Sequence, residues 1–304
     1  MSVSHLAPAS PRPATRRDTG SGTGGAGTGQ PRRRRRRFGS PWLALLAWAV
    51  GLIVFFPVLW MFLTGFKQES QASTDPPTFF FEPTLEQYRA ILGRDFGPYF
   101  LNSLSATLIS TALVIVLGTP AAYALSLAKI PRWRDSLFFF ISTRMMPVVA
   151  IILPLYIIAK NLNLLDNVTM LALVYTVMNL PIAVWMIRSF LIEIPSEVLE
   201  AARVDGASRT TEMRRIILPM IAPGLAATAL ICFIFAWNEF FFAVSLTATQ
   251  APTVPVFLVG FITSEGLFWA RLSAASTMAA LPVILAGWAA QKWLVRGLSL
   301  GAVK

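Results

Sequence analysis

The sequence predicts an all-α integral membrane protein with six transmembrane helices. Of its 304 residues, 55% are hydrophobic and only 13% are charged, whereas soluble domains carry about 25% Asp, Glu, Lys and Arg. Six apolar stretches are each long enough to cross a bilayer, which takes about 20 residues. Basic residues concentrate in alternate connecting segments, as they do where those segments stay in the cytoplasm. Together these three observations predict the fold class.

A polar, basic tail precedes the first span. Residues 1–40 hold nine Arg against one acidic residue, Asp18, and six of the Arg are consecutive from Arg32 to Arg37. A segment rich in Gly, Ser, Thr and Pro cannot bury enough apolar surface to fold. We therefore predict a disordered cytoplasmic tail over 1–38. Its Arg run suits the anionic headgroups beside a span, so we expect a lipid contact and no nucleic-acid partner.

Six predicted spans follow along the chain. Their approximate residue ranges are 42–66, 101–128, 136–159, 167–187, 216–247 and 272–291. The apolar stretch 216–264 could hold two spans, but a seventh span would move Lys292, Arg296 and Lys304 outside. The positive-inside rule favours six spans with both termini in the cytoplasm. Residues 39–100 then hold the first span and an external loop, 101–293 the helical core, and 294–304 a cytoplasmic tail.

Proline is dense within these spans. Each proline lacks an N–H group and leaves the carbonyl four residues earlier without its helical partner. Inside a membrane that carbonyl must be satisfied by protein or by water in a cavity. We therefore expect kinked helices around a polar pathway. The prolines are Pro57, Pro120, Pro147, Pro154, Pro181, Pro223 and Pro282.

The chain lacks the residues that most catalytic chemistry needs. Cys232 is the only Cys and His5 the only His, which excludes an intrachain disulfide, a His-based metal site and a His-dependent catalytic triad. No G-x-x-x-x-G-K-[ST] phosphate-binding loop occurs. We expect a transport subunit without a cofactor or metal, not an enzyme. An ion-coupled secondary transporter is the alternative, although the spans show neither repeated halves nor paired acidic residues at mid-membrane.

A predicted cytoplasmic loop, 193–219, lies between the fourth and fifth spans. Ser196 can cap a short helix after Pro195, and Gly206 can end that helix in a left-handed conformation. Ser208 can cap a second helix that runs into the fifth span. Helical spacing places four residues on one face of the first helix: Val198, Ala201, Ala202 and Asp205. From these residues alone, a docking element and a connector packed on the spans both remain open.

One motif in this loop has fixed spacing. The residues Glu200, Ala201, Ala202, Gly206, Ile216, Leu218 and Pro219 follow the pattern E-A-A-x3-G-x9-I-x-L-P. The pattern resembles the signature loop of permease subunits of binding-protein-dependent ABC importers, and Asp205 lies within it. This resemblance implies a type I ABC importer permease fold over 101–293. It also implies a coupling helix seated on an ATPase.

The same resemblance implies the protein's partners and location. They are a second permease subunit, two ATP-binding cassette ATPase subunits and an extracytoplasmic solute-binding protein, at the bacterial cytoplasmic membrane. The segments Phe235–Phe240 and Gly297–Lys304 resemble the second permease of carbohydrate systems of the maltose-transporter type. Ser142–Pro147 and Glu265–Ser276 resemble sorbitol and mannitol permeases. A sugar or small polyol substrate is therefore expected, and a disaccharide stays open.

Polar residues inside the spans are candidates for the substrate pathway, because charge is costly in a membrane. The candidates are Arg144, Asn179, Trp237, Asn238 and Glu239. Arg144 and Glu239 lie too far apart along their spans to pair directly. The aromatic face of Trp237, the Asn238 amide and the Glu239 carboxylate suit the recognition of hydroxyl groups. As alternatives, Arg144 could bind the carbonyl that Pro147 leaves free, and Glu239 could form a contact between two permeases.

Overall fold

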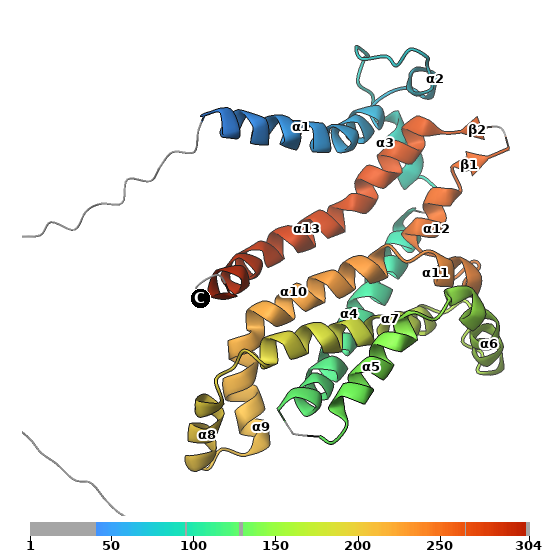
Figure 1. Cartoon of the computed structure of the whole chain (residues 1–304). Helices are drawn as coiled ribbons and strands as arrows, with labels where there is room; N and C mark the ends of the chain where they lie inside the picture. Colours follow the sequence, from blue (N-terminus) through green and yellow to red (C-terminus); the bar gives the residue numbers. More distant parts are fainter. Residues whose placement is uncertain (1–40, 95, 128–129, 265, 302–304) are drawn as a thin grey trace, which may run out of the picture. The chain divides into compact units, whose positions relative to one another are not determined.

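The computed structural model describes residues 41–94, 96–127, 130–264 and 266–301, which are almost wholly helical (Figure 1). The predicted tail 1–38 lies outside these residues. The chain divides into two compact units, Met1–Gly51 and Leu52–Lys304. The first helix, α1 (Pro41–Thr64), runs across that boundary. All candidate functional residues lie in the second unit.

Helices that could cross a membrane dominate the described residues. Five helical stretches are long and apolar enough, and a sixth crossing follows if one bent helix pair counts as a single span. The five stretches are α1, α4 (Phe96–Ser126), α7 (Val168–Leu191), the continuous run Arg209–Trp237 and α13 (Trp269–Gly301). This confirms the predicted all-α membrane fold. α13 continues past the predicted end of the last span at 291, so the expected tail 294–304 begins inside a helix.

The third predicted span, 136–159, is broken at Pro147, one of the prolines that we expected to kink the helices. Two helices, α5 (Trp133–Arg144) and α6 (Val148–Asn161), meet at a bend of 88°. Pro147 lies at the break with extended backbone angles (φ −59°, ψ 123°) and has no N–H to continue the helical ladder. Pro120 and Pro181, in contrast, remain inside the continuous helices α4 and α7.

The fifth span is shifted relative to the prediction of 216–247. It begins with α9 (Arg209–Thr211), widens into a π-helical turn, η1 (Glu212–Ile217), and continues as α10 (Leu218–Trp237). The Leu218 N–H donates to the carbonyl of Met213, five residues earlier, as π winding requires. A separate short helix, α11 (Phe241–Leu246), follows after a turn. Glu239 therefore lies in this turn and not on a spanning helix.

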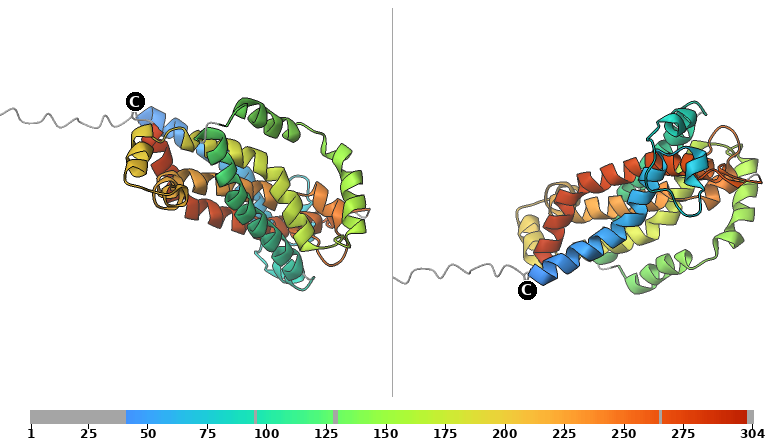
Figure 2. Two further views of the ribbon diagram at one scale, coloured as in Figure 1. Left: turned by 90° about the horizontal axis from the view of Figure 1, so that it is seen from below. Right: turned by 90° about the horizontal axis from the view of Figure 1, so that it is seen from above.

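α4, α7 and α10 form the centre of the second unit. α4 packs along α7, α10 contacts both, and α13 packs on α10. The π turn lies at one end of α10, next to α8 (Ser196–Val204), as Figures 1 and 2 show. α7 and α10 approach closely at Gly224, where an added Cβ would lie 2.3 Å from the Phe190 ring. Glycine is therefore needed at this position for the two helices to touch.

Short elements gather at the opposite end of α7 and α10 (Figure 1). They are α2 (Glu69–Ala72), α3 (Glu86–Leu92), α12 (Val254–Val259) and the hairpin of β1 (Ile262–Thr263) with β2 (Gly266–Leu267). The segment around Pro252 and Pro255 holds α12. Pro255 occupies the second position of that helix, where a missing N–H costs nothing.

Candidate functional site

The residues of the predicted short helix in the loop form α8. Pro195 and not Ser196 is its N-cap, with extended angles of φ −60° and ψ 134° and no capping side chain. The prediction of a Ser196 cap is therefore wrong, because the proline ring already sets the extended backbone that precedes the first turn. Ser208 does cap the next helix, since its hydroxyl accepts the Thr211 N–H at 3.3 Å.

Gly206 ends α8 in the predicted left-handed conformation, with φ +81°. Beyond it, the Ala207 N–H donates to the Ala202 carbonyl at 2.9 Å, which closes the helix end. Among the described residues, no atom other than those of Gly206 and its chain neighbours lies within 4 Å of the place where a Cβ at Gly206 would stand. The backbone angle, and not a lack of space, therefore demands glycine here.

α8 buries one face and exposes the other. Leu199 and Ala202 are buried, and Leu199 packs in a cluster with Ile194 and Ile217. Of the four residues predicted to share one face of this helix, only Ala202 is buried. The exposed residues of the helix and its end are Ser196, Glu197, Val198, Glu200, Ala201, Arg203, Val204 and Asp205. α8 is thus packed on the bundle and also free to receive another protein.

The remaining motif residues lie outside α8. Ile216 belongs to the π turn, and Leu218 and Pro219 are the first two residues of α10. Pro219 supplies no N–H to the turn before it, which matches the change from π to α winding at this point. The second half of the motif therefore shapes the entry into the fifth span.

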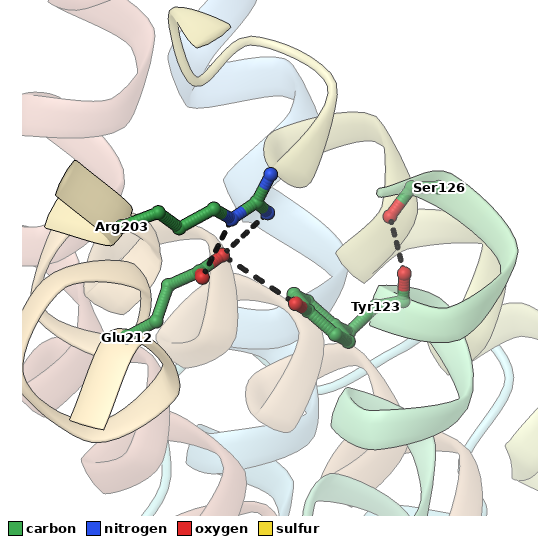
Figure 3. A network of polar contacts seen from close by, with 4 residues as sticks. All are labelled: Tyr123, Ser126, Arg203 and Glu212. Atoms are coloured by element: carbon green, nitrogen blue, oxygen red, sulfur yellow. Dashed lines mark hydrogen bonds and ion pairs between the residues drawn. The ribbon is translucent and has the colours of Figure 1, made fainter. Parts of the chain in front are cut away.

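A polar junction that the sequence analysis missed joins α8 to the bundle (Figure 3). The Glu212 carboxylate is 1% exposed and accepts two hydrogen bonds from Arg203, Nε to Oε2 and Nη2 to Oε1, each 3.1 Å long. The Tyr123 hydroxyl, on α4, donates to Oε1 at 3.4 Å. The hydrogen bonds and charge of Glu212 raise the pKa of Arg203. The sequence signal was an acidic residue nine positions after Arg203, directly before the basic and apolar run Met213–Pro219.

Arg144 and Asn179 lie close together where α5, α7 and α10 meet. Arg144 Nη1 donates to the Met178 carbonyl at 2.8 Å, and its guanidinium lies 5.4 Å from the centre of the Phe235 ring. The neighbouring Asn179 is fully buried and donates to the Cys232 carbonyl at 3.4 Å. Its Oδ1 atom has no hydrogen-bond partner. Two of the five pathway candidates therefore lie at one helix junction.

The other three candidates have partners of their own. The Trp237 indole is buried and donates to the Ala279 carbonyl at 3.1 Å, which ties α10 to α13. The exposed Asn238 amide donates to the Ile234 carbonyl at 2.8 Å. Both carboxylate oxygens of Glu239 accept backbone N–H groups from the first turn of α11 at 3.0–3.2 Å. Arg144 and Glu239 thus have different partners, in line with the expectation that they act separately.

A second carboxylate junction, also missed, lies at the opposite end. Asp166 accepts the backbone N–H groups of residues 248–251, each at 2.9 Å. Burial alone would raise the pKa of Asp166, but these four donors together lower it well below the ordinary value. The Asn102 side chain, on α4, donates to the carbonyls of Gln250 and Pro252 at 3.1 Å. The loop between α11 and α12 is therefore held from two sides.

Comparison with known proteins places this geometry among transporters. Residues 114–299 match the family described as "Binding-protein-dependent transport system inner membrane component". The trehalose transport system permease protein SugB of Mycobacterium tuberculosis is 34% identical over 82% of this chain and 92% of its own length. The diacetylchitobiose uptake system permease protein DasC of Streptomyces coelicolor is 32% identical over 88% of this chain and 98% of its own.

A solved structure shares the fold. The chain resembles a subunit of a bacterial ABC transporter involved in the import of the acidic polysaccharide alginate, with a TM-score of 0.68. The two sequences are 22% identical, and the match covers 84% of this chain and 95% of the other. At this identity the likeness supports the fold.

Proposed function

This chain belongs to the family of binding-protein-dependent transport system inner membrane components, and from that membership we propose that it translocates a sugar or polyol. It is a permease subunit of an ABC importer, in the cytoplasmic membrane. It works with a second permease, ATPase subunits and a solute-binding protein. It is not itself an enzyme, because a separate subunit hydrolyses ATP. An ion-coupled secondary transporter is therefore no longer an alternative.

The observation that carries the mechanism is the motif on α8. Gly206, with its positive φ, sets the end of the helix, and Glu200, Ala201 and Asp205 stand on its exposed side. We propose that this side seats on an ATPase subunit as the coupling helix. The small Ala201 and the acidic Glu200 and Asp205, together with Val204, which is 88% exposed, provide a surface that a partner can approach closely. Closure of the ATPases would then displace α8.

The orientation follows from the same proposal. If α8 docks on the ATPase, the loop 193–219 is cytoplasmic, and the short elements at the other end of α7 are extracytoplasmic. The basic tail 1–38 and the end of α13 beyond 293 then lie inside, as the distribution of Lys and Arg predicts. Residues 39–100 supply the first span with an external loop, and 101–293 the transport core.

Sugars are the better supported substrate class. Two relatives over 30% identical carry the names of trehalose and diacetylchitobiose systems, so we propose a disaccharide or a similar sugar. The finer proposal of a sorbitol- or mannitol-like polyol is supported only by Ser142–Pro147 and Glu265–Ser276. Of these segments, residue 265 lies outside the described residues.

The pathway candidates divide into two groups. Arg144, Asn179 and Asn238 keep polar atoms that their partners leave available: an exposed guanidinium, a buried unpaired Oδ1 and an exposed amide. We propose these three as contributors to the pathway. The contacts of Trp237 and Glu239 within this chain support a structural role at the end of α10 and the start of α11. A contact of Glu239 with a second permease stays a prediction.

Uptake by the assembled transporter tests the proposed function. The permease pair, the ATPase and the binding protein would be reconstituted in liposomes with ATP on the cytoplasmic side. We expect labelled trehalose or diacetylchitobiose to accumulate only when ATP and the binding protein are both present. Accumulation of sorbitol or mannitol alone would favour the polyol. Uptake of none of these carbohydrates would contradict the assigned substrate class.

A further inference from the structure

The Glu212 carboxylate joins three segments that must stay in register if α8 moves. Glu212 itself begins the π turn that leads directly into α10. Its Oε1 atom is shared between Arg203 of α8 and Tyr123 of α4, and its Oε2 atom binds only Arg203 (Figure 3). Neither of these two partner residues belongs to the π turn. The carboxylate is therefore a contact between helices and not a local cap.

Resting on the proposed docking role of α8, we propose that Glu212 is a positioning residue of the transport cycle. It holds α8 to α4 and to the start of α10, so that a displacement of α8 reaches both membrane helices. A buried carboxylate is stable only while its partners stay in place. The three segments are therefore expected to move together.

The apolar contact of α8 with the bundle is too small to do this alone. Only Leu199 and Ala202 of α8 are buried, and apolar packing is non-directional. The Arg203–Glu212 contact is bidentate, and this geometry fixes orientation as well as distance. Arg203 is half exposed, with 51% of its side chain accessible, so its stem can follow small shifts of α8 while the guanidinium stays bound.

The C-terminal end of α4, which carries Tyr123, is held in its helical form. Ser126 donates to the carbonyls of Ala122 and Tyr123, at 2.6 and 3.3 Å. These bonds tie the last turn of α4 to the backbone of Tyr123, the residue whose hydroxyl binds Glu212. A pull on that hydroxyl is therefore transmitted to the helix and is not absorbed by fraying. On the α10 side of the Glu212 junction lies the π turn. It also favours a functional role, because such turns occur frequently at functional sites.

A charge-pair cycle in the complete transporter tests the proposal. The variants are Arg203→Gln, Glu212→Gln, their combination, and Tyr123→Phe, with Arg209→Gln as the control that removes one exposed charge from the same loop. Each is assayed for ATPase recovery, for hydrolysis stimulated by the binding protein, and for uptake. Arg203→Gln strands a buried carboxylate, so uptake should fall about tenfold, within the usual range of coupling energies, at unchanged ATPase recovery.

Rescue separates positioning from a merely structural role. The double variant places two amides opposite each other and removes the stranded charge, so it should regain about half of the lost uptake. Tyr123→Phe keeps the ion pair and should lower uptake by a smaller factor, with stimulated hydrolysis falling less than uptake. Arg209→Gln should match the wild type.

Several results would overturn the proposal. They are wild-type uptake in both single charge variants, or a double variant no better than Arg203→Gln. If Arg203→Gln fails to assemble, Tyr123→Phe decides, and wild-type uptake there overturns the proposal while reduced uptake supports it. Failure of the docking assignment has a different signature. In that case Glu200→Lys, on the exposed side of α8, would leave ATPase recovery unchanged whatever the Glu212 variants do.

Discussion

Two carboxylates stabilise opposite ends of the same helix bundle by different means. Glu212 is held by the side chains of Arg203 and Tyr123, which come from two other helices. Asp166 is held by four consecutive backbone N–H groups of a single loop. The first junction depends on long side chains that can turn, whereas the second depends on the path of the main chain.

This difference separates an adaptable junction from a rigid one. Arg203 has several rotatable bonds and an exposed stem, so its contact with Glu212 can persist while α8 shifts. The four backbone donors to Asp166 cannot turn independently, because their directions are set by consecutive backbone angles, and the Thr249 hydroxyl adds a side-chain donor, at 3.2 Å. Any shift of that loop would break all four bonds together. We infer that the Asp166 end of the bundle stays rigid. The displacement of α8 is transmitted to the bundle at the Glu212 end.

Replacing Asp166 should have the largest effect on stability. Asp166→Ala removes the acceptor of four backbone N–H groups. Hydrogen bonds to a charged group contribute roughly 1.5–3 kcal/mol each, but donors at the surface regain water, so we expect a net loss of about 2–4 kcal/mol. Thermal unfolding of the purified complex measures this. Asp135→Ala, at an exposed position of α5, is the control, and an equal loss in both variants would remove the contrast between the two ends.

The pH dependence of the Asp166 contribution is a second test of the rigid end. Its folded-state pKa lies below the ordinary value of 3.8. A depressed pKa stabilises the folded state above the unfolded value, and this stabilisation is lost as the pH falls through the folded value. The stability gap between wild type and Asp166→Ala should therefore be constant from about pH 5 to 8 and narrow below about pH 4. A gap that changes between pH 6 and 8 would contradict the backbone-clamp description.

Substitution of Gly206 sharpens the description of the other end. A β-branched side chain in the left-handed region costs about 1–2 kcal/mol, whereas Asn tolerates this region. Gly206→Val should reorient the end of α8 and lower ATPase recovery, while Gly206→Asn should stay near the wild type. Because a Cβ at this position meets no neighbour, equal losses in both variants would show that the side chain, and not the backbone angle, matters.

The smallest effect is expected at Asn102, which supports the rigid loop from the α4 side. Asn102→Ala removes two neutral hydrogen bonds to the carbonyls of Gln250 and Pro252. A net loss of about 1 kcal/mol is expected, clearly less than for Asp166→Ala in the same unfolding assay. A larger loss would mean that the neutral contacts, and not the carboxylate, hold the loop.

The sequence predicted the spans well where apolar length decides the structure and less well where single hydrogen bonds do. Pro120, Pro147 and Pro181 carry the same local penalty, yet only Pro147 lies at a bend. The other two lie within α4 and α7, which pack along each other over most of their length. Packing of this kind cannot be read from a local sequence pattern.

Side-chain partners were the least predictable feature. The partners of Glu212 lie 9 and 89 positions away in the chain, and those of Asp166 lie at least 82 positions away. Spacing alone cannot identify such pairs without the fold. The motif of α8 was predictable because Gly206 and the alanines act locally, through a backbone angle and a small side chain. The prediction of a Ser196 cap was wrong because of another local effect: Pro195 already sets the extended backbone before the helix.

The central claim is that α8 faces the ATPase at the end opposite the Asp166 junction. Thiol labelling of Val204→Cys and Gln250→Cys tests it most directly, because the native Cys232 is fully buried and adds little background. We expect Gln250→Cys to react with an impermeant reagent only from outside. Val204→Cys should react only from the cytoplasmic side and should be protected when the ATPase is bound. Labelling of Val204→Cys from outside, or labelling unaffected by the ATPase, would contradict the account.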